Sequence, residues 1–135
     1  MTPKNIIIRR LESSKHAVYW KKAQDFYQGM LTANNDGNWN SLVLQAVHCA
    51  ISATDALLVK KKGIRCSSKD HFDIIELLKT SIDDKEINKY AGSLAKIINF
   101  KHLVEYEDRM VMEKEAYDIF LKTDRYYNWV KSKIS

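Results

Sequence analysis

Ionisable side chains are densest between residues 101 and 109, where a stripe of apolar residues comes to an end. The stripe includes Leu94 and Ile98, and helical spacing extends it to Lys101, so we expect this cation to point inward, where it needs an anion. Lys101 and Glu105 are four residues apart and can form an ion pair on one helix face. The residues that we predict to line a polar cleft for a phosphate-bearing ligand are Lys101, His102, Tyr106 and Arg109. An exposed last helical turn with ordinary ion pairs, in which Glu105 neutralises Lys101, fits the same pattern.

A histidine and an aspartate interrupt the most apolar segment of the chain, residues 42–58. His48 and Asp55 are seven residues apart, so they share one helix face with Ile51. Two helical turns, about 10 Å, separate them, which is too far for direct contact, and each needs a partner from another helix. Both are therefore further candidates for the cleft, and Asp55 is an alternative partner for Lys101. A core histidine and a buried aspartate bonded to a neighbouring Tyr or Lys form the structural alternative.

The whole chain has a net charge of +5, and its positive charge is concentrated in the first half. The densest basic stretch surrounds Gly63 and could meet phosphates, although a solvated helix end is the simpler interpretation. The stretch consists of Lys60, Lys61, Lys62, Arg65 and Lys69. His71 follows it, close to the start of a helix that Ser67 is expected to cap, and a helix N-terminus beside cations can hold an anion. His71 is accordingly a candidate ligand-binding residue, unless it only packs on the loop.

Other sequence motifs for cofactor binding, metal binding or catalysis are weak or absent in this sequence. It contains neither a glycine-rich phosphate loop nor a dinucleotide-binding fingerprint. His102 and Glu105 could supply two metal ligands, but the chain offers no second pair of this kind, so we expect no metal and no cofactor. Cys49 lies among apolar residues, which suits an inert buried thiol. Two cysteines form neither a disulfide framework nor a zinc cluster, which favours a reducing, cytoplasmic setting.

The composition favours one globular domain built from helices. Hydrophobic residues make up 45% and charged residues 29% of the 135 residues, as in ordinary folded domains. Four glycines and one proline are few for a sandwich or barrel, in which every hairpin needs turn residues. No apolar run reaches the roughly 18–20 residues of a membrane span, and the apolar run at residues 6–8 is too short for the core of a signal peptide. We therefore expect a single domain over residues 1–135 and no membrane contact.

Apolar residues at three- and four-residue spacing predict four long helices and one short helix. The expected helices cover residues 14–34, 38–61, 68–81, 83 or 84 to at least 98, and 113–133. The second is apolar nearly all round, which places it in the middle of the fold. Brief loops between the long helices predict an all-α, up-and-down antiparallel bundle. Residues 1–12 are expected to form an N-terminal arm, and residues 5–9, the one stretch with a strand-like pattern, to fray.

Several segments resemble those of HEPN domains, a family of helical bundles. The second predicted helix has small residues around a His, then a polar residue before Ala-Leu, as in that family. The following loop carries a His near the third helix, and an ionisable cluster ends the fourth. The resembling segments are 46–58, 67–71 with 75–78, 101–109, and 113–116 with 129–130. The resemblance covers about residues 14–131, and its order and spacing agree with the five predicted helices.

The resemblance implies an up-and-down bundle, often dimeric, that binds or acts on RNA or nucleotides. Ribonuclease members of the family carry Arg, four to six residues and then His in the region of the fourth helix. At the resembling place this chain has Lys101 and, after four residues, Tyr106. Lys keeps a positive charge but lacks the fork geometry of Arg, and Tyr is a poor general base at neutral pH. Arg65 and His71 have the required spacing, but they lie in a different loop, and we treat that match as chance.

Two classes of function follow. The first, which the missing motif favours, is a non-catalytic HEPN-like module that binds a nucleotide, RNA or a partner protein, with a nucleotidyltransferase as the suspected partner. The alternative is a HEPN-type endoribonuclease with a degenerate site, in which His102 or His48 does the acid–base work and Lys101 or Arg109 steadies the phosphate. We also expect a homodimer, because the last helix has more aromatic side chains than one inward stripe can use. These side chains are Tyr117, Tyr126, Tyr127 and Trp129.

Overall fold

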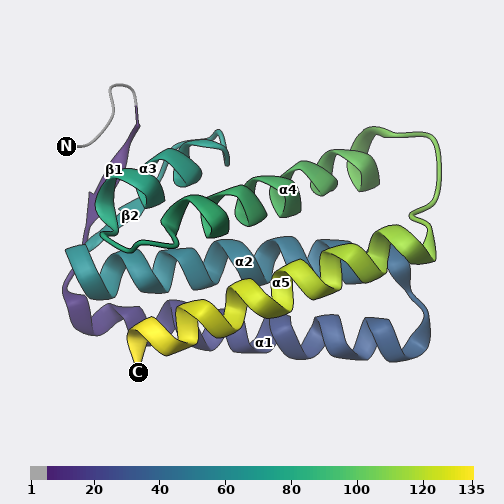
Figure 1. Cartoon of the computed structure of the whole chain (residues 1–135), viewed down its shortest axis with the longest axis horizontal. Coiled ribbons are helices and arrows are strands. Elements are labelled where there is room, and N and C mark those ends of the chain that lie inside the picture. The colour runs from purple at the N-terminus through teal and green to yellow at the C-terminus, as the bar shows by residue number, and fades with distance from the viewer. Residues whose placement is uncertain (1–5) are drawn as a thin grey trace.

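The computed structural model describes residues 6–135 and shows an all-α bundle, as predicted (Figure 1). Four long helices and one short helix follow one another along the chain. Their bounds are α1, His16–Asp36; α2, Trp39–Lys62; α3, Asp73–Ser81; α4, Ile87–Tyr106; and α5, Glu113–Ile134. A short 3-10 turn, Ser13–Lys15, precedes α1. The first, second and fifth helices begin and end within two residues of the predicted positions.

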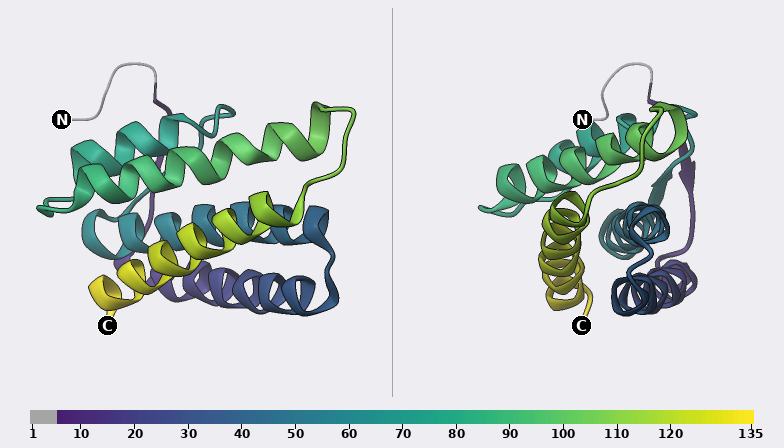
Figure 2. Two further views of the ribbon diagram at one scale, coloured as in Figure 1. Left: turned by 45° about the vertical axis from the view of Figure 1, so that its right-hand side comes forward. Right: turned by 90° about the vertical axis from the view of Figure 1, so that its right-hand side faces the viewer.

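Helix α2 lies at the centre of the bundle. Seen end-on, α1, α4 and α5 lie around it, and α3 lies beside α4 (Figure 2). Fourteen of its 24 residues are buried, because a helix that is apolar on nearly every side gains most when neighbours cover all of its faces. The length and hydropathy of α2 would also allow it to cross a bilayer. However, 78% of the apolar 18-residue segment that meets this criterion is buried inside the bundle. The fold therefore uses α2 as its core helix.

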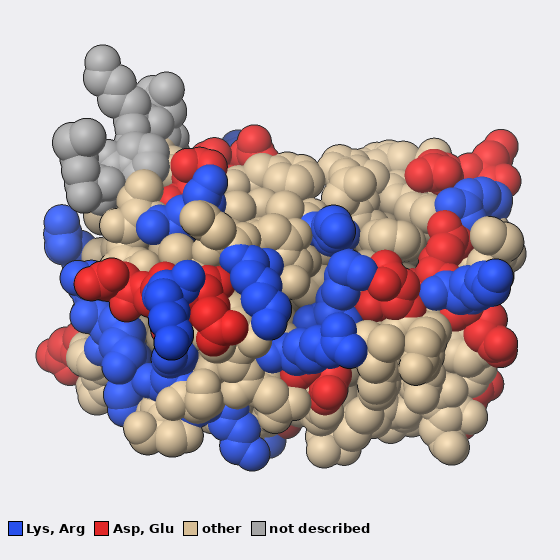
Figure 3. Space-filling model, viewed as in Figure 1, with Lys and Arg blue, Asp and Glu red and all other residues tan. Residues whose placement is uncertain are grey.

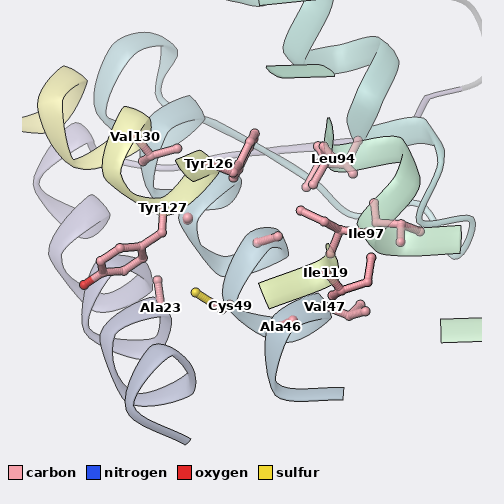
Figure 4. Packing of buried hydrophobic residues seen from close by; sticks show 14 of the residues in the cluster. Ala23, Ala46, Val47, Cys49, Leu94, Ile97, Ile119, Tyr126, Tyr127 and Val130 are labelled. Carbon is pink, nitrogen blue, oxygen red and sulfur yellow. The ribbon is translucent and has the colours of Figure 1, made fainter. Parts of the chain in front are cut away.

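Side chains of four helices meet on two sides of α2 (Figure 4). On one side, Ala23 of α1 and Tyr127 of α5 lie near Cys49 of α2. On the other side, Leu94 of α4 and Ile119 of α5 pack beside α2. Burial raises the pKa of the Cys49 thiol to about 12, so this cysteine stays a neutral core residue.

Three of the aromatic side chains that suggested a dimer belong to the core. Tyr126, Tyr127 and Trp129 are at most 8% exposed. Tyr127 stacks on Trp20 of α1 with the ring centroids 4.7 Å apart, and Trp129 stacks on Tyr90 of α4 with the centroids 4.5 Å apart. These rings tie α5 to its neighbours within one chain. The inference that α5 carries surplus aromatic surface is therefore wrong for these three residues.

Part of the N-terminal arm forms a strand, so the prediction that it frays is wrong. Strand β1 (Ile8–Arg10) pairs in antiparallel fashion with strand β2 (Ile64–Cys66), which follows α2 directly. A strand of three residues is stable here because its partner is already fixed to the end of the core helix. The first five residues of the predicted arm lie outside the described residues.

Gly63 makes the turn from α2 into β2. Its φ is +63°, a left-handed conformation that favours glycine, and its N–H donates to the Val59 carbonyl in the last turn of α2. A Cβ at Gly63 would come within 2.9 Å of the carbonyl oxygen of Leu11. The N–H of Leu11 in turn donates to the carbonyl of Gly63 at 2.8 Å. The glycine thus lets the N-terminal segment approach the end of α2 closely.

Helix α3 begins at Asp73, five residues later than predicted. The serines that we expected to cap it bind the N-terminal segment instead. The N–H of Ser67 donates to the Ile7 carbonyl at 2.8 Å, and the N–H of Ile7 donates to Oγ of Ser68 at 2.9 Å. Because these groups extend the strand pairing beyond β1 and β2, the chain is not free to start a helix there.

Residues 67–72, which we call the β2–α3 loop, run beside the C-terminal half of α4 (Figures 1 and 2). The carboxylate of Asp70 accepts a hydrogen bond from the N–H of Phe72 at 2.9 Å and shapes the turn before α3. His71 therefore lies in this turn, two residues before the helix begins, and does not open the helix as the family resemblance implied.

Helix α4 continues to Tyr106, so its apolar stripe and Lys101 lie on one unbroken helix. The helix begins at Ile87, later than the predicted start at residue 83 or 84. The Asp84 carboxylate accepts from the N–H of Glu86 at 2.8 Å and forms an ion pair with Lys133 at 2.6 Å. This side chain shapes a turn and ties it to α5 instead of capping the first turn of α4.

Truncation of Leu57 tests the central position of α2. Leu57 is fully buried, so Leu57→Ala should lower the free energy of unfolding by about 2–5 kcal/mol, through lost apolar burial and the cavity left behind. Val18→Ala, at a 50% exposed position of α1, is the control and should change it by less than about 0.5 kcal/mol. Urea denaturation measures both changes. Equal, small losses in the two variants would contradict this position of α2.

Candidate functional site

Two cavities of about 210 Å³ each adjoin one another around His71. The first, the α4 cavity, lies between the β2–α3 loop and α4. Its walls include His71, Phe72, Lys101, His102, Glu105 and Tyr106. The second, the β2 cavity, lies between α2, β2 and α3. Its walls include Ile51, Asp55, Arg65, Ser68, His71 and Ile74. Because His71 and its neighbour Asp70 belong to both walls, a group bound in one cavity lies next to the other.

Lys101 is paired with a carboxylate of its own helix. Its Nζ lies 3.4 Å from Oε1 of Glu105, as the sequence spacing predicted. The two side chains are 26% and 34% exposed, so water partly screens their attraction. Glu105 therefore neutralises Lys101, which was one of the two interpretations that the sequence allowed. The pair lies on a cavity wall, however, where an incoming anion can compete for Lys101.

His48 of α2 and His71 of the β2–α3 loop both experience the charge of Lys101. Partial burial lowers the pKa of His48, and Lys101 and His71 lower it further. Burial and Lys101 also lower the pKa of His71, against the opposing effects of Asp70 and Glu105. Both imidazoles are thus neutral at pH 7, because an ordinary histidine titrates near 6.5. Each can gain a proton, and with it a positive charge, when an anion binds beside it.

Asp55 is almost fully buried in the β2 cavity and is paired with Arg65. The Nε–H of Arg65 donates to Oδ2 of Asp55 at 3.2 Å, and the guanidinium lies 5.1 Å from the ring centroid of Tyr19. Oδ1 of Asp55 has no hydrogen-bond partner among residues 6–135. Burial raises the pKa of Asp55 to about 6, although Arg65 acts in the opposite direction. Asp55 is therefore the partner of Arg65 and not of Lys101.

Arg109 lies outside both cavities, in the loop that follows α4. Its two terminal nitrogens donate to the two oxygens of Glu115 at 2.8 Å each. The same carboxylate accepts from the N–H of Met112 at the start of α5, so the pair caps this helix. Arg109 lowers the pKa of Glu115 to about 2. The prediction that Arg109 lines the cleft is wrong, because its guanidinium is used in this cap.

Most of the residues singled out in the sequence come together. Lys101, His102, Tyr106 and His71 line the α4 cavity, and Asp55 lines the adjoining cavity. His48 lines neither cavity, although the charge of Lys101 acts on it. Phe72 also lines the α4 cavity but was not predicted, because its position beside His71 was its only signal in the sequence. The spacing of Arg65 and His71 was treated as chance, yet both residues line the β2 cavity.

The basic stretch around Gly63 divides between two roles. Lys60, Lys61 and Lys62 form the last turn of α2, where cations suit the negative end of the helix dipole. This part fits the interpretation as a solvated helix end. Arg65 and Lys69 instead line the two cavities. On the face drawn in Figure 3, Lys and Arg gather at the left and centre with Asp and Glu among them, so they do not form one unbroken basic track there.

Known proteins supply no further constraint on this site. The chain matches no family model and no curated protein. The resemblance of residues 14–131 to HEPN domains therefore stays a prediction. Among residues 6–135, no group of three or more His, Cys, Asp or Glu side chains is placed to hold a metal ion.

The buried carboxyl of Asp55 predicts a pH dependence of stability. Its pKa of about 6 in the folded chain exceeds that of an unfolded aspartate, about 4, so the folded state binds the extra proton as the pH falls. Between pH 7 and pH 5, this group should add about 1 kcal/mol to the free energy of unfolding, and Asp55→Asn should lack the gain. Urea denaturation of both proteins at the two pH values measures it. Parallel pH curves would contradict the assignment.

Proposed function

We propose that the chain is a HEPN-like module that binds the phosphate of RNA or of a nucleotide in the α4 cavity, without cleaving it. The observation that supports this is that Lys101 of α4 and His71 of the β2–α3 loop line one cavity, and that the charge of Lys101 also acts on His48 of α2. A cation beside an imidazole offers a phosphate both positive charge and hydrogen-bond donors. An apolar ligand could not form hydrogen bonds or ion pairs with these groups.

A phosphate must displace Glu105 from Lys101, and the charges around the cavity allow this exchange. At pH 7, Lys101 and Lys69 balance Glu105 and Asp70 on the cavity wall. A bound phosphate favours the protonated form of His71 and, at longer range, of His48, which adds positive charge near the cavity. Phosphate binding should therefore strengthen as the pH falls from 7 toward 6.

Binding without cleavage is supported by the groups that α4 contributes. Tyr106 stands where ribonuclease members of the resembling family carry a histidine, and a phenol is a poorer general base than an imidazole at neutral pH. Lys101 offers a point charge and not the two-pronged geometry of an arginine. These groups suit the retention of a phosphate better than proton transfer.

A second candidate function is RNA cleavage, and the position of His71 favours it. Arg65 and His71 line the β2 cavity together. The lowered pKa of His71 leaves a neutral imidazole at pH 7, the form that can take a proton from a ribose 2′-hydroxyl. The guanidinium of Arg65, however, is already bound to Asp55 at 3.2 Å, so it is less available to a phosphate. We therefore rank cleavage second.

The homodimer, the nucleotidyltransferase partner and the cytoplasmic location stay predictions. Three aromatic side chains of α5 are used in the core, but Tyr117 is 61% exposed. Met110 and Met112, in the loop before α5, are 71% and 60% exposed. These three side chains are the apolar surface that supports the proposal of a second copy.

Lys101→Ala and Glu105→Gln test the proposed site in opposite directions. With a fluorescent single-stranded RNA of about twelve nucleotides, Lys101→Ala should weaken binding and reduce the slope of log affinity against log salt by about one contact. Glu105→Gln removes the competing carboxylate and should tighten binding. Lys96→Ala removes an exposed cation of the same helix and, as the control, should have a smaller effect than Lys101→Ala. Fluorescence anisotropy at several salt concentrations measures all three variants.

Denaturing gels of the same mixtures distinguish the two candidate functions. RNA that is retained and stays intact supports binding alone. Cleavage by the wild type that is lost in His71→Ala would establish the second candidate. If Lys101→Ala lowers the melting temperature and leaves RNA binding unchanged, the pair with Glu105 is structural and the proposed phosphate site is wrong.

A further inference from the structure

Three aromatic rings lie together at the α4 cavity, and we call them the aromatic ledge. They belong to Phe72 of the β2–α3 loop and to His102 and Tyr106 of α4. The planes of Phe72 and His102 are within 7° of parallel, with their centroids 6.3 Å apart. The centroid of Tyr106 lies 5.6 Å from that of His102, with 32° between the planes. Two of the rings are thus nearly parallel, and the third is tilted beside them.

The aromatic ledge is not part of the core. Tyr106 is 74% exposed and Phe72 is 37% exposed, and His102 is also exposed. The backbone nevertheless fixes their positions, because His102 and Tyr106 are one turn apart on a helix and the N–H of Phe72 is bonded to Asp70. When a flat partner covers apolar ring faces that are exposed to water, the free energy of the system falls. Within the part of the chain that the structure describes, the ledge is therefore a stacking surface that no other ring covers.

We propose that the aromatic ledge stacks a base of single-stranded RNA whose phosphate is held at Lys101. This inference rests on the proposed function and names the form of nucleic acid that the site accepts. Lys101 and His102 are consecutive residues on the wall of one cavity, so a phosphate at the first and a base at the second belong to the same or adjacent nucleotides. Stacking on rings accepts every base, so affinity should depend little on sequence.

The ledge would select single strands over duplexes. In a duplex, neighbouring base pairs cover both faces of each base, and a base must leave the stack before it can lie on a ring. A single strand presents such bases without this cost. Lys69 and Lys101 attract the backbone of either form, so the phosphate site alone would not discriminate between them. Discrimination between the two forms is therefore the property that the ledge adds.

Tyr106→Ala tests the ledge, with Tyr117→Ala as a matched control that removes a 61% exposed tyrosine from α5. The probes are the single-stranded RNA of about twelve nucleotides, its duplex, and a ribose-phosphate oligomer of the same length without bases. Tyr106→Ala should weaken binding of the single strand about fivefold or more and leave the other two probes unchanged. Tyr106→Trp should keep the wild-type affinity because it keeps a ring. Tyr117→Ala should change none of the three affinities.

Several outcomes would overturn the inference. An equal loss for the oligomer without bases, or for the duplex, would show that Tyr106 does not act through stacking. If Lys101→Ala weakens all three probes and Tyr106→Ala weakens none, the proposed phosphate site stands and the ledge is wrong. If no probe binds the wild type, both proposals fail. If Tyr106→Ala changes the particle mass in light scattering and leaves RNA binding intact, the ledge is a protein contact. The exposed position of Tyr106 predicts an unchanged melting temperature.

Discussion

The burial of α2 determines where every other element lies. Because this helix is apolar on nearly all sides, α1, α4 and α5 pack around it, and the strand pair closes its C-terminal end. Ile51 and Asp55 of α2 line the β2 cavity, and His48, two turns before Asp55, is exposed, with its ring beside Phe26 of α1. Ionisable groups are tolerated in the middle of α2 only where polar partners or water reach them. The candidate site therefore follows from the packing of an apolar helix that its neighbours do not completely enclose.

The candidate site is not an open basic patch, because a phosphate must compete with carboxylates that already neutralise the cations. Arg65 is held by Asp55 and Lys101 by Glu105, so each of these cations already has a carboxylate. The groups without a fixed charge are the imidazoles, whose lowered pKa values leave them neutral at pH 7 and able to respond to an anion. A bound phosphate would favour the protonated forms of these imidazoles, which adds positive charge to a site whose lysine and arginine are already paired with carboxylates. This property distinguishes the α4 cavity from the basic last turn of α2, which faces solvent.

Hydrophobic periodicity was sufficient for the bundle and for the elements that carry Lys101, His102 and Tyr106, because long amphipathic helices depend mainly on local pattern. It failed where local groups bind distant ones. The strand β1 depends on a partner more than fifty residues away, and the serines of the β2–α3 loop resemble a helix cap although they bond to Ile7. Arg109 was misplaced for the same reason, since its bond to Glu115 crosses a loop whose path the sequence does not reveal. The position of Phe72 in the site likewise depends on that of the loop against α4.

Titration of the histidine side chains by NMR tests the central claim, which is that a phosphate binds in the α4 cavity, between the β2–α3 loop and α4. In the free protein, His48 and His71 should titrate below the ordinary histidine pKa, because burial and Lys101 disfavour their charged forms. Saturation with short single-stranded RNA should raise both pKa values, since a nearby phosphate stabilises the imidazolium. His16, at the start of α1 and bonded to the Ser13 carbonyl, lines neither cavity and serves as a reference whose NMR signals should not change when RNA is added. Unmoved curves for His48 and His71 in the RNA-saturated protein would contradict the account.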